Sequence, residues 1–307
     1  MPITSHPLPW LAALCSMGAV AVWAAPAGAY CRTTTCDPSF DSCQVVNGCV
    51  QGGKPLRWPA SCVSFGVQRD GSERRNIDYA TALDVINAAF QRWTSADCGG
   101  GSRPSILLEP NGEPIICAEP RYNIDAPNAN VWMFRDLAWP YETPGSGEVS
   151  TRTLALTTVT FNVQTGDIYD ADVEINSRSV PLDVTGDGQG LSLAAIVTHE
   201  AGHFLGLSHS TSDDATMRPA YGEGMEELSA DDEAGICAVY PADAPARSCN
   251  FAPRHGFSSR CYEKDDGCST VAPGRDRRSP GGLALAIVGL GLGLFGARKK
   301  LGAQRTS

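Results

Sequence analysis

The sequence of 307 residues lacks several common signatures. It has no C-x-x-C pair, which argues against a zinc site built from cysteines. It has no stripe of basic residues and no run of aromatic residues among basic ones, and its formal net charge is −10. Nucleic acid is therefore not an expected partner. Solubility is the simpler explanation of the acidity.

The protein does have twelve cysteines, which point to an oxidising compartment and to disulfides. Cys15 falls in the apolar N-terminal run, and the remaining number is odd, so one cysteine is unpaired or has another role. The others are Cys31, Cys36, Cys43, Cys49, Cys62, Cys98, Cys117, Cys237, Cys249, Cys261 and Cys268. A hydrophobic content of 42% suits a globular protein with a sizeable core.

Residues 199–209, HEAGHFLGLSH, contain three of the five histidines in the protein. His199 and His203 are four residues apart, so on a helix they lie on one face and can bind a single metal ion. Gly206 can take a positive φ and end the helix, and the chain can then turn back to deliver His209 as a third ligand. Three nitrogen ligands leave the fourth position of tetrahedral Zn²⁺ open for water, as in catalytic sites.

The stretch fills every fixed position of H-E-x-x-H-x-x-G-x-x-H and predicts hydrolysis of peptide bonds. Zinc lowers the pKa of its water to about 7 and polarises the scissile carbonyl. Glu200 is the predicted general base, which takes the proton of the attacking water and passes it to the leaving amine. The alternatives are a buried helix that happens to carry histidines and a structural zinc clip, which has no need of Glu200.

The N-terminus predicts an exported protein. Residues 8–25 are an apolar run, and Ala27-Gly28-Ala29 then forms a small-x-small cleavage site. Residues 1–29 are therefore predicted to be a signal peptide that is cut before Tyr30. The segment 30–57 is short, polar and cysteine-rich. It is predicted to be tied by disulfides, with a zymogen-type propeptide as the alternative.

The stretch 58–242 is the predicted catalytic domain. Alternating or β-branched residues predict strands, and apolar residues at helical spacing predict helices. The expected strands are residues 61–67, 105–108, 130–134, 154–163 and 168–175, and the expected helices are residues 78–93, 191–205 and 229–240. The expected N-caps are Asn76 or Asp78, Ser192 and Ser229.

The C-terminal part is predicted to be a linker followed by an anchor. Residues 243–280 are rich in proline, serine and charge and carry three of the cysteines. Residues 281–297 are apolar and uncharged, which is near the lower limit of about 17 residues for a membrane helix. Because basic residues follow, a transmembrane or sorting segment is predicted over 281–300, with a cytoplasmic C-terminus. A buried core helix is the alternative.

With these residues in view, the chain resembles the metzincin zinc peptidases. It is most similar to their matrixin branch, the matrix-metalloproteinase-like enzymes, in a bacterial form. The resemblance covers roughly residues 58–242 and places Met217 at the family's Met-turn, beneath the metal site. The other segments similar to matrixin elements are residues 88–93 (AAFQRW), 166–176 (GDIYDADVEIN) and 229–236 (SADDEAGI), with Tyr240 after the last.

The resemblance implies an α+β fold, in which a twisted mixed sheet with an antiparallel edge strand lies over the cleft and the zinc helix lies beneath. It implies Zn²⁺ as the cofactor and protein or peptide substrates that pair with the edge strand by β-augmentation. It also implies structural Ca²⁺. Residues 183–188 resemble the first half of a calcium loop, but the twelfth position is Ala194, so an EF-hand is not indicated and an acidic entry loop is the alternative.

Three features depart from the matrixin pattern. The P-R-C-G cysteine switch is absent, which puts thiol-controlled latency in doubt. The predicted catalytic domain carries cysteines that most matrixins lack. Arg218 follows the methionine where tyrosine is common, and Tyr221 is expected to be a pocket wall or surface residue rather than a zinc-side tyrosine.

The tail resembles the C-terminal sorting tails of myxobacterial surface proteins, the MYXO-CTERM type. The resemblance rests on Cys268 within Gly-Cys-Ser, the apolar span and the basic residues after it. It implies that Cys268 is processed or modified, which would explain the odd cysteine. We therefore expect the cysteines from Cys62 to Cys261 to be oxidised and Cys268 to lie outside any internal disulfide. An ordinary membrane anchor is the alternative.

The sequence thus predicts a secreted or surface-anchored zinc-dependent metalloendopeptidase. The rival class is a non-catalytic adhesion or binding module that retains the fold, and Glu200 argues against it. A peptidase for one dedicated partner stays open beside broad degradation. Cleavage preference is expected to depend on the shape of the loop around residues 217–228.

Overall fold

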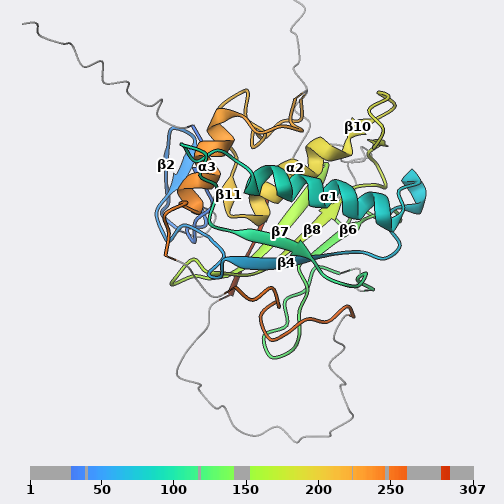
Figure 1. The fold of residues 1–307 in the computed structure, drawn as a ribbon, viewed down its shortest axis with the longest axis horizontal. Helices are drawn as coiled ribbons and strands as arrows, with labels where there is room; N and C mark the ends of the chain where they lie inside the picture. Colours follow the sequence, from blue (N-terminus) through green and yellow to red (C-terminus); the bar gives the residue numbers. More distant parts are fainter. Residues whose placement is uncertain are drawn as a thin grey trace, which may run out of the picture.

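The computed structural model describes residues 29–38, 41–116, 119–141, 153–222, 224–245 and 249–260, together with the backbone of residues 285–290. A mixed β-sheet forms the centre of the molecule, and the two long helices, α1 (Tyr79–Thr94) and α2 (Leu193–Phe204), cover one of its faces (Figure 1). The α+β class predicted from the sequence is confirmed.

Parallel strands make up most of the sheet, whose strand order is β12-β7-β8-β6-β4-β5. β4 runs parallel to β5 and to β6, and β6 runs parallel to β8, whereas β7 runs antiparallel to β8. The strand bounds are β4 Cys62–Val67, β5 Leu107–Pro110, β6 Val131–Phe134, β7 Ala155–Asn162, β8 Ile168–Ile175 and β12 Leu285–Leu290. The antiparallel strand expected beside the cleft is β7.

Strand β8 is buried along its whole length. Because side chains alternate between the faces of a strand, Val173 points into the main hydrophobic core, while Asp170 and Asp172 point to the other face. Asp172 accepts hydrogen bonds from the backbone N–H groups of Arg121 and Val131, both at 2.8 Å. Burial raises the pKa of Asp172 to about 7, and burial and the neighbouring Asp172 raise the pKa of Asp170 well above its usual value.

The helices α1 (Tyr79–Thr94) and α2 (Leu193–Phe204) pack against each other on the sheet. The Asp78 carboxylate caps α1 by accepting from Thr81 N–H at 2.8 Å, and the Ser192 hydroxyl oxygen caps α2 by accepting from Ala195 N–H at 3.1 Å. Almost every residue of α2 is buried, so its polar side chains need partners inside the protein.

The remaining elements are short. α3 (Ala230–Val239) starts at a capping box made by Ser229 and Asp232. A 3-10 turn covers Glu73–Arg75, and β9 (Leu182–Asp183) runs parallel to β10 (Leu191–Ser192) just before α2.

The N-terminal segment forms its own small pairings beside α3 (Figure 1). β1 (Cys31–Arg32) pairs antiparallel with β11 (Leu207–Ser208), and β2 (Gln44–Val46) forms a hairpin with β3 (Cys49–Gln51). Disulfides join Cys31 to Cys49 and Cys36 to Cys43. The disulfides expected for this segment are therefore present.

Two further disulfides tie distant parts of the chain together. Cys98, after α1, is bonded to Cys237 on α3, and Cys62 on β4 is bonded to Cys249. The second bond holds the segment 249–260 against the sheet, where Phe257 pairs with Asn128 in an isolated parallel bridge. Cys117, Cys261 and Cys268 lie outside the described residues, so their predicted oxidation states stay predictions.

Where the structure describes the predicted membrane-spanning segment, the chain forms a strand and not a helix. Residues 285–290 form β12 (Leu285–Leu290), which pairs antiparallel with β7 from Leu285 opposite Asn162 to Leu290 opposite Thr157. A strand suits this sequence because the outer edge of β7 offers unpaired backbone groups and LAIVGL contains β-branched residues. The rest of 281–300 lies outside the description. Among the described residues, none of the helices has both the length and the apolar character needed to cross a membrane.

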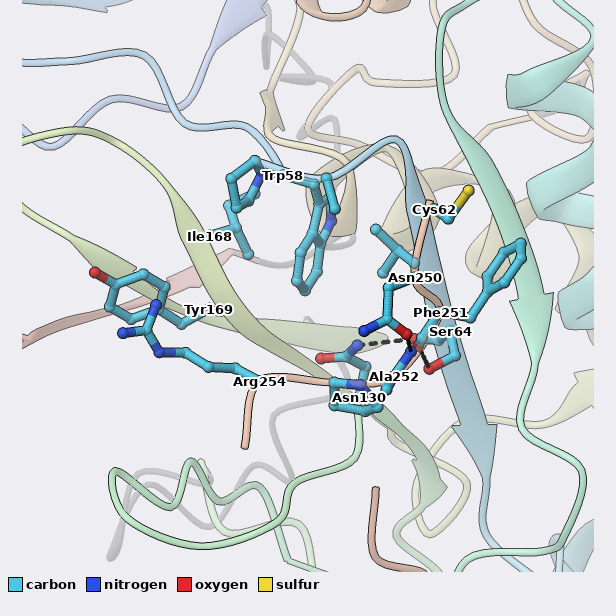
Figure 2. Close-up of a pocket in the computed structure, with 14 residues that line it drawn as sticks. Trp58, Cys62, Ser64, Asn130, Ile168, Tyr169, Asn250, Phe251, Ala252 and Arg254 are labelled. Carbon is cyan, nitrogen blue, oxygen red and sulfur yellow. Dashed lines mark hydrogen bonds between the residues drawn. The ribbon is translucent and has the colours of Figure 1, made fainter. Parts of the chain in front are cut away.

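A pocket of about 180 Å³ lies between β4, the start of β8 and the segment 250–254 (Figure 2). Its walls are mostly apolar and include Trp58, Ile168 and Tyr169. Its polar groups are already engaged: the Ser64 hydroxyl donates to the Phe251 carbonyl oxygen at 2.5 Å. The described residues that line it include no histidine and no carboxylate, so acid–base or metal chemistry must be sought elsewhere.

Candidate metal centre

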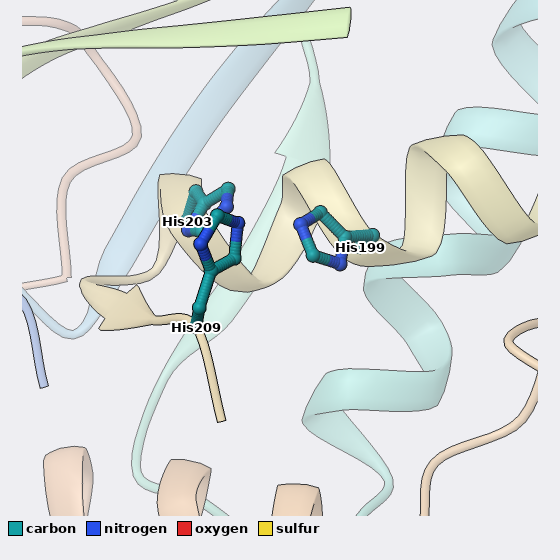
Figure 3. A group of neighbouring side chains, drawn as sticks. All are labelled: His199, His203 and His209. Atoms are coloured by element: carbon teal, nitrogen blue, oxygen red, sulfur yellow. The ribbon is translucent and has the colours of Figure 1, made fainter. Parts of the chain in front are cut away.

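Helix α2 brings His199 and His203 onto one face, as their spacing predicts (Figure 3). Gly202 lies between them and has its own packing role. A Cβ at this position would lie 2.2 Å from the sulfur of Met217 and 2.8 Å from the ring of Trp93. Glycine therefore lets Met217, which is 1% exposed, lie directly against the helix that carries the histidines.

His209 reaches the same place through a tight turn. α2 ends at Phe204, and Gly206 follows with a φ of +96°. A Cβ at Gly206 would lie 2.7 Å from the carbonyl oxygen of Leu56, so both the left-handed backbone and the available space require glycine. Strand β11 then leads the chain back to His209.

The three imidazole rings face one another (Figure 3). Their ring centroids are 4.7 Å apart for His199 and His203, 4.9 Å for His203 and His209, and 5.3 Å for His199 and His209. Each residue offers one ring nitrogen, and these nitrogens lie within 4.8 Å of one another. The Nε2 atoms of His199 and His203 are buried and have no hydrogen-bond partner among the described residues. A metal ion would satisfy these buried lone pairs.

The second ring nitrogen of each helix histidine faces a backbone carbonyl. His199 Nδ1 lies 2.7 Å from the Thr216 oxygen, and His203 Nδ1 lies 2.9 Å from the Leu207 oxygen. A carbonyl oxygen only accepts, so each Nδ1 carries the proton and each Nε2 presents a lone pair to the centre. Burial, and then the nearby His209, lowers the pKa of His199 to about 3, and burial lowers the pKa of His203 well below its usual value. Both rings are therefore neutral, which is the form that binds metals.

Glu200, the predicted general base, is fully buried on α2. Its Oε2 accepts a hydrogen bond from the hydroxyl of Thr157 at 2.5 Å. Thr157 lies on β7 and is also 0% exposed. The sequence does not single out Thr157, because the strand 154–163 contains several threonines and nothing in their order marks the one that contacts Glu200.

Asp232 supports the centre from α3. Its carboxylate accepts from the backbone N–H groups of Thr216 at 2.7 Å and Met217 at 3.0 Å. Since the Thr216 carbonyl accepts from His199, Asp232 fixes the backbone at residues 216–217 against a predicted metal ligand. From the sequence, Asp232 is expected only to be an acidic residue in the first turn of a helix.

Two other residues considered from the sequence have local roles. The Tyr221 hydroxyl accepts from Ser192 N–H at 2.9 Å, at the start of α2. The Asp183 carboxylate accepts from the backbone N–H groups of Thr185, Gly186 and Gly188. Its oxygens thus close the loop 183–188 itself, and calcium binding there stays a prediction.

The donor set of the histidine cluster fits zinc. Three imidazoles, two of them neutral and held through Nδ1 by backbone carbonyls, suit a catalytic zinc site, which keeps one position open. Another cluster of potential ligands in the described part of the chain consists of Cys36, Asp41 and Cys43. Its two cysteines are joined in a disulfide, so they offer no thiolate.

Comparison with known proteins shows which family the part of the chain around this cluster is similar to. Residues 132–241 match the family model described as Matrixin. This part of the chain is matrixin-like. It contains the three histidines, Glu200 and Met217, so the site lies inside the matched region. The match supports a metalloprotease at the level of the family.

Several relatives share segments at about two-fifths identity. Human matrix metalloproteinase-25 is 39% identical over 72 residues, which are 20% of this chain and 13% of that protein. Human matrilysin is 41% identical over 58 residues, 18% of this chain and 22% of that protein. Metalloendoproteinase 5-MMP of Arabidopsis thaliana is 41% identical over 69 residues, 22% of this chain and 18% of that protein. The chain thus spans at most 22% of the length of these three relatives.

Proposed function

We propose that the protein is a zinc-dependent metalloendopeptidase. The observation that carries the proposal is the convergence of three imidazoles, from His199, His203 and His209, at the helix that also carries Glu200. Both helix histidines are neutral and buried, and each presents Nε2 to one point. The matrixin match supports the same chemistry at family level.

His199, His203 and His209 would hold the ion. When bound, zinc supplies Lewis-acid polarisation of the scissile carbonyl and lowers the pKa of a water to about 7. Glu200 accepts the proton of the attacking water and returns it to the leaving amine. The Thr157 hydroxyl holds one oxygen of Glu200, which orients the other oxygen for proton transfer.

The substrates of this activity are extended segments of protein or peptide. A strand-like substrate would pair with β7, whose residue Thr157 contacts Glu200, so the edge of the sheet and the general base are adjacent. In the full chain this edge is paired with β12. A substrate that pairs with β7 at residues 157–162 must therefore compete with β12.

The proposal is tested by Glu200→Gln, which removes the base but keeps all three histidines. We expect zinc content and folding to be retained and hydrolysis of a quenched peptide to fall at least about 10²–10⁴-fold, the contribution typical of general-base catalysis. His203→Ala should lose zinc as well as activity. Glu109→Gln, at an exposed position on β5, is the matched control and should behave as wild type. Equal activity in wild type and Glu200→Gln contradicts the mechanism, and a wild type with zinc but no activity on any peptide favours a binding module.

The proposed site of action is outside the cytoplasm, either secreted or at the cell surface. The predicted signal peptide and the four disulfides of the described residues support export. The predicted sorting or membrane segment at the C-terminus would retain the protein at the surface. Cell fractionation with sequencing of the mature N-terminus tests both points, and a cytoplasmic protein that keeps residues 1–29 contradicts them.

A further inference from the structure

The described residues of the N-terminal segment 30–57, called the strap below, lie along the turn that delivers His209. β1 of the strap pairs with β11, with Cys31 opposite Ser208 and Arg32 opposite Leu207. His209 follows directly after this pairing. His209 therefore follows a strand, β11, whose pairing partner β1 lies in the N-terminal part of the chain.

Thr33 connects the strap to a second histidine. Its backbone N–H donates to the Gly206 carbonyl at 3.0 Å, and its hydroxyl donates to the Leu207 carbonyl at 3.0 Å. The same Leu207 oxygen faces His203 Nδ1 at 2.9 Å. Thr33 is only 6% exposed, so this chain of hydrogen bonds is shielded from water. Thr33 thus fixes the carbonyl that orients His203.

The start of the strap holds the chain on the other side of His209. The Asp231 carboxylate accepts from the backbone N–H of Tyr30, the first residue after the predicted cleavage site, at 2.9 Å, and from the hydroxyl of Ser210 at 2.6 Å. Ser210 follows His209. The residues on both sides of the ligand are therefore anchored through the strap.

The disulfide between Cys31 and Cys49 fixes β1 to the hairpin of the strap. Cys31 is 2% exposed and is the residue opposite Ser208. The tip of the hairpin also touches the same turn, because a Cβ at Gly48 would lie 2.4 Å from Thr211. The disulfide between Cys36 and Cys43 lies elsewhere in the strap, with partly exposed cysteines.

We propose that the strap is a positioning element for the metal ligands His203 and His209, and that Thr33 and the Cys31–Cys49 disulfide are the groups through which it acts. The inference rests on the proposed zinc site. Without the Thr33 hydroxyl, the Leu207 carbonyl loses one of its two donors. Without the disulfide, the strand partner of β11 is no longer tied down. Either change loosens the cluster and speeds the loss of the metal.

The first test compares Thr33→Val, which keeps shape but loses the hydroxyl, with Thr33→Ser, which keeps the hydroxyl. Zinc transfer to a chelator should be about tenfold faster in Thr33→Val, near the lower end of what outer-shell changes cause, and close to wild type in Thr33→Ser. With Co²⁺ in place of zinc, the visible d–d bands should shift in Thr33→Val and return in Thr33→Ser. A purely structural role would lower the thermal midpoint and leave the spectrum unchanged, and that result overturns the proposal.

The second test compares two disulfide deletions in the full chain. Cys31→Ala with Cys49→Ala should release zinc at least about tenfold faster, whereas Cys36→Ala with Cys43→Ala should release it at the wild-type rate. If both double variants release zinc at the same rate, the proposed role of the Cys31–Cys49 disulfide is wrong. If the first pair fails to fold, the Thr33 variants alone decide. A wild type that takes up neither zinc nor Co²⁺ refutes the proposed zinc site itself, which separates that failure from a failure of the strap.

Discussion

The substitution Thr157→Val tests most directly how the predicted general base, Glu200, is held in position. Valine keeps the volume and β-branching of threonine and removes the hydroxyl that donates to Glu200 Oε2 at 2.5 Å. Both side chains are 0% exposed. Because neither side chain is open to solvent, bulk water does not replace the lost donor, and the carboxylate loses a fixed orientation.

The magnitude follows from the strength of this contact. A hydrogen bond to a charged group contributes about 1.5–3 kcal/mol. If that energy serves to hold the carboxylate in its reacting geometry, kcat/KM falls about 10- to 150-fold, since each 1.36 kcal/mol is about a factor of ten. We expect most of the loss in kcat, because Thr157 contacts the base.

The assay measures kcat and KM on a quenched peptide, with zinc content checked in each variant. Thr157→Ser keeps the hydroxyl and should retain most of the activity. The decisive comparison is Thr157→Val made in the Glu200→Gln background, where it should have no further effect because its target is gone. Wild-type kcat in Thr157→Val, or an equal fractional loss in both backgrounds, refutes the claim that Thr157 acts through Glu200.

Two other predictions concern β8 and β12. The pKa values of Asp170 and Asp172 are raised in the folded state, so their contribution to stability is fully present below about pH 4 and is lost as pH rises, through about 7 for Asp172. Asp170→Asn should reduce this fall in the free energy of unfolding between pH 5 and 8. Denaturant titrations at several pH values measure that free energy, and the same pH dependence in the variant and the wild type contradicts the prediction. Ending the chain at residue 260 removes β12, so KM for an unstructured peptide should fall with kcat unchanged; an unchanged KM shows that β12 does not compete.

The parts of the fold set by local pattern were predictable. The strand 168–175 has the predicted ends, because a turn precedes it and its alternation is regular. Helix α2, the predicted zinc helix, begins after Ser192 and ends before Gly206, because a cap and a glycine mark its ends. The second strand was expected at 105–108 and lies at Leu107–Pro110, since pairing with β4 fixes its register and proline is tolerated at a strand end.

The candidate site was predictable as far as its motif reaches. The spacing of the histidines determines which rings share a helix face, and Gly206 marks the turn that returns His209. Thr157 and Asp232 contact the site from other elements, and Thr33 lies more than 160 residues before the histidine that it helps to orient. Such contacts depend on how strands and helices are placed in space, and no local pattern reports that placement.

The strand at residues 285–290 was not predicted for the same reason, because it depends on a contact with a distant part of the chain. Their apolar composition is compatible with a membrane helix, a core helix or a strand. The unpaired edge of β7, formed by residues far away in the sequence, favours the strand.

Zinc-edge X-ray absorption on the mature wild-type protein tests the central claim most directly. The account predicts about one zinc per chain, bound by three imidazole nitrogens at about 2.0–2.1 Å and one oxygen, with the imidazole count reduced in His209→Ala. A shell containing sulfur at about 2.3 Å, or the absence of zinc uptake by correctly folded protein, contradicts it.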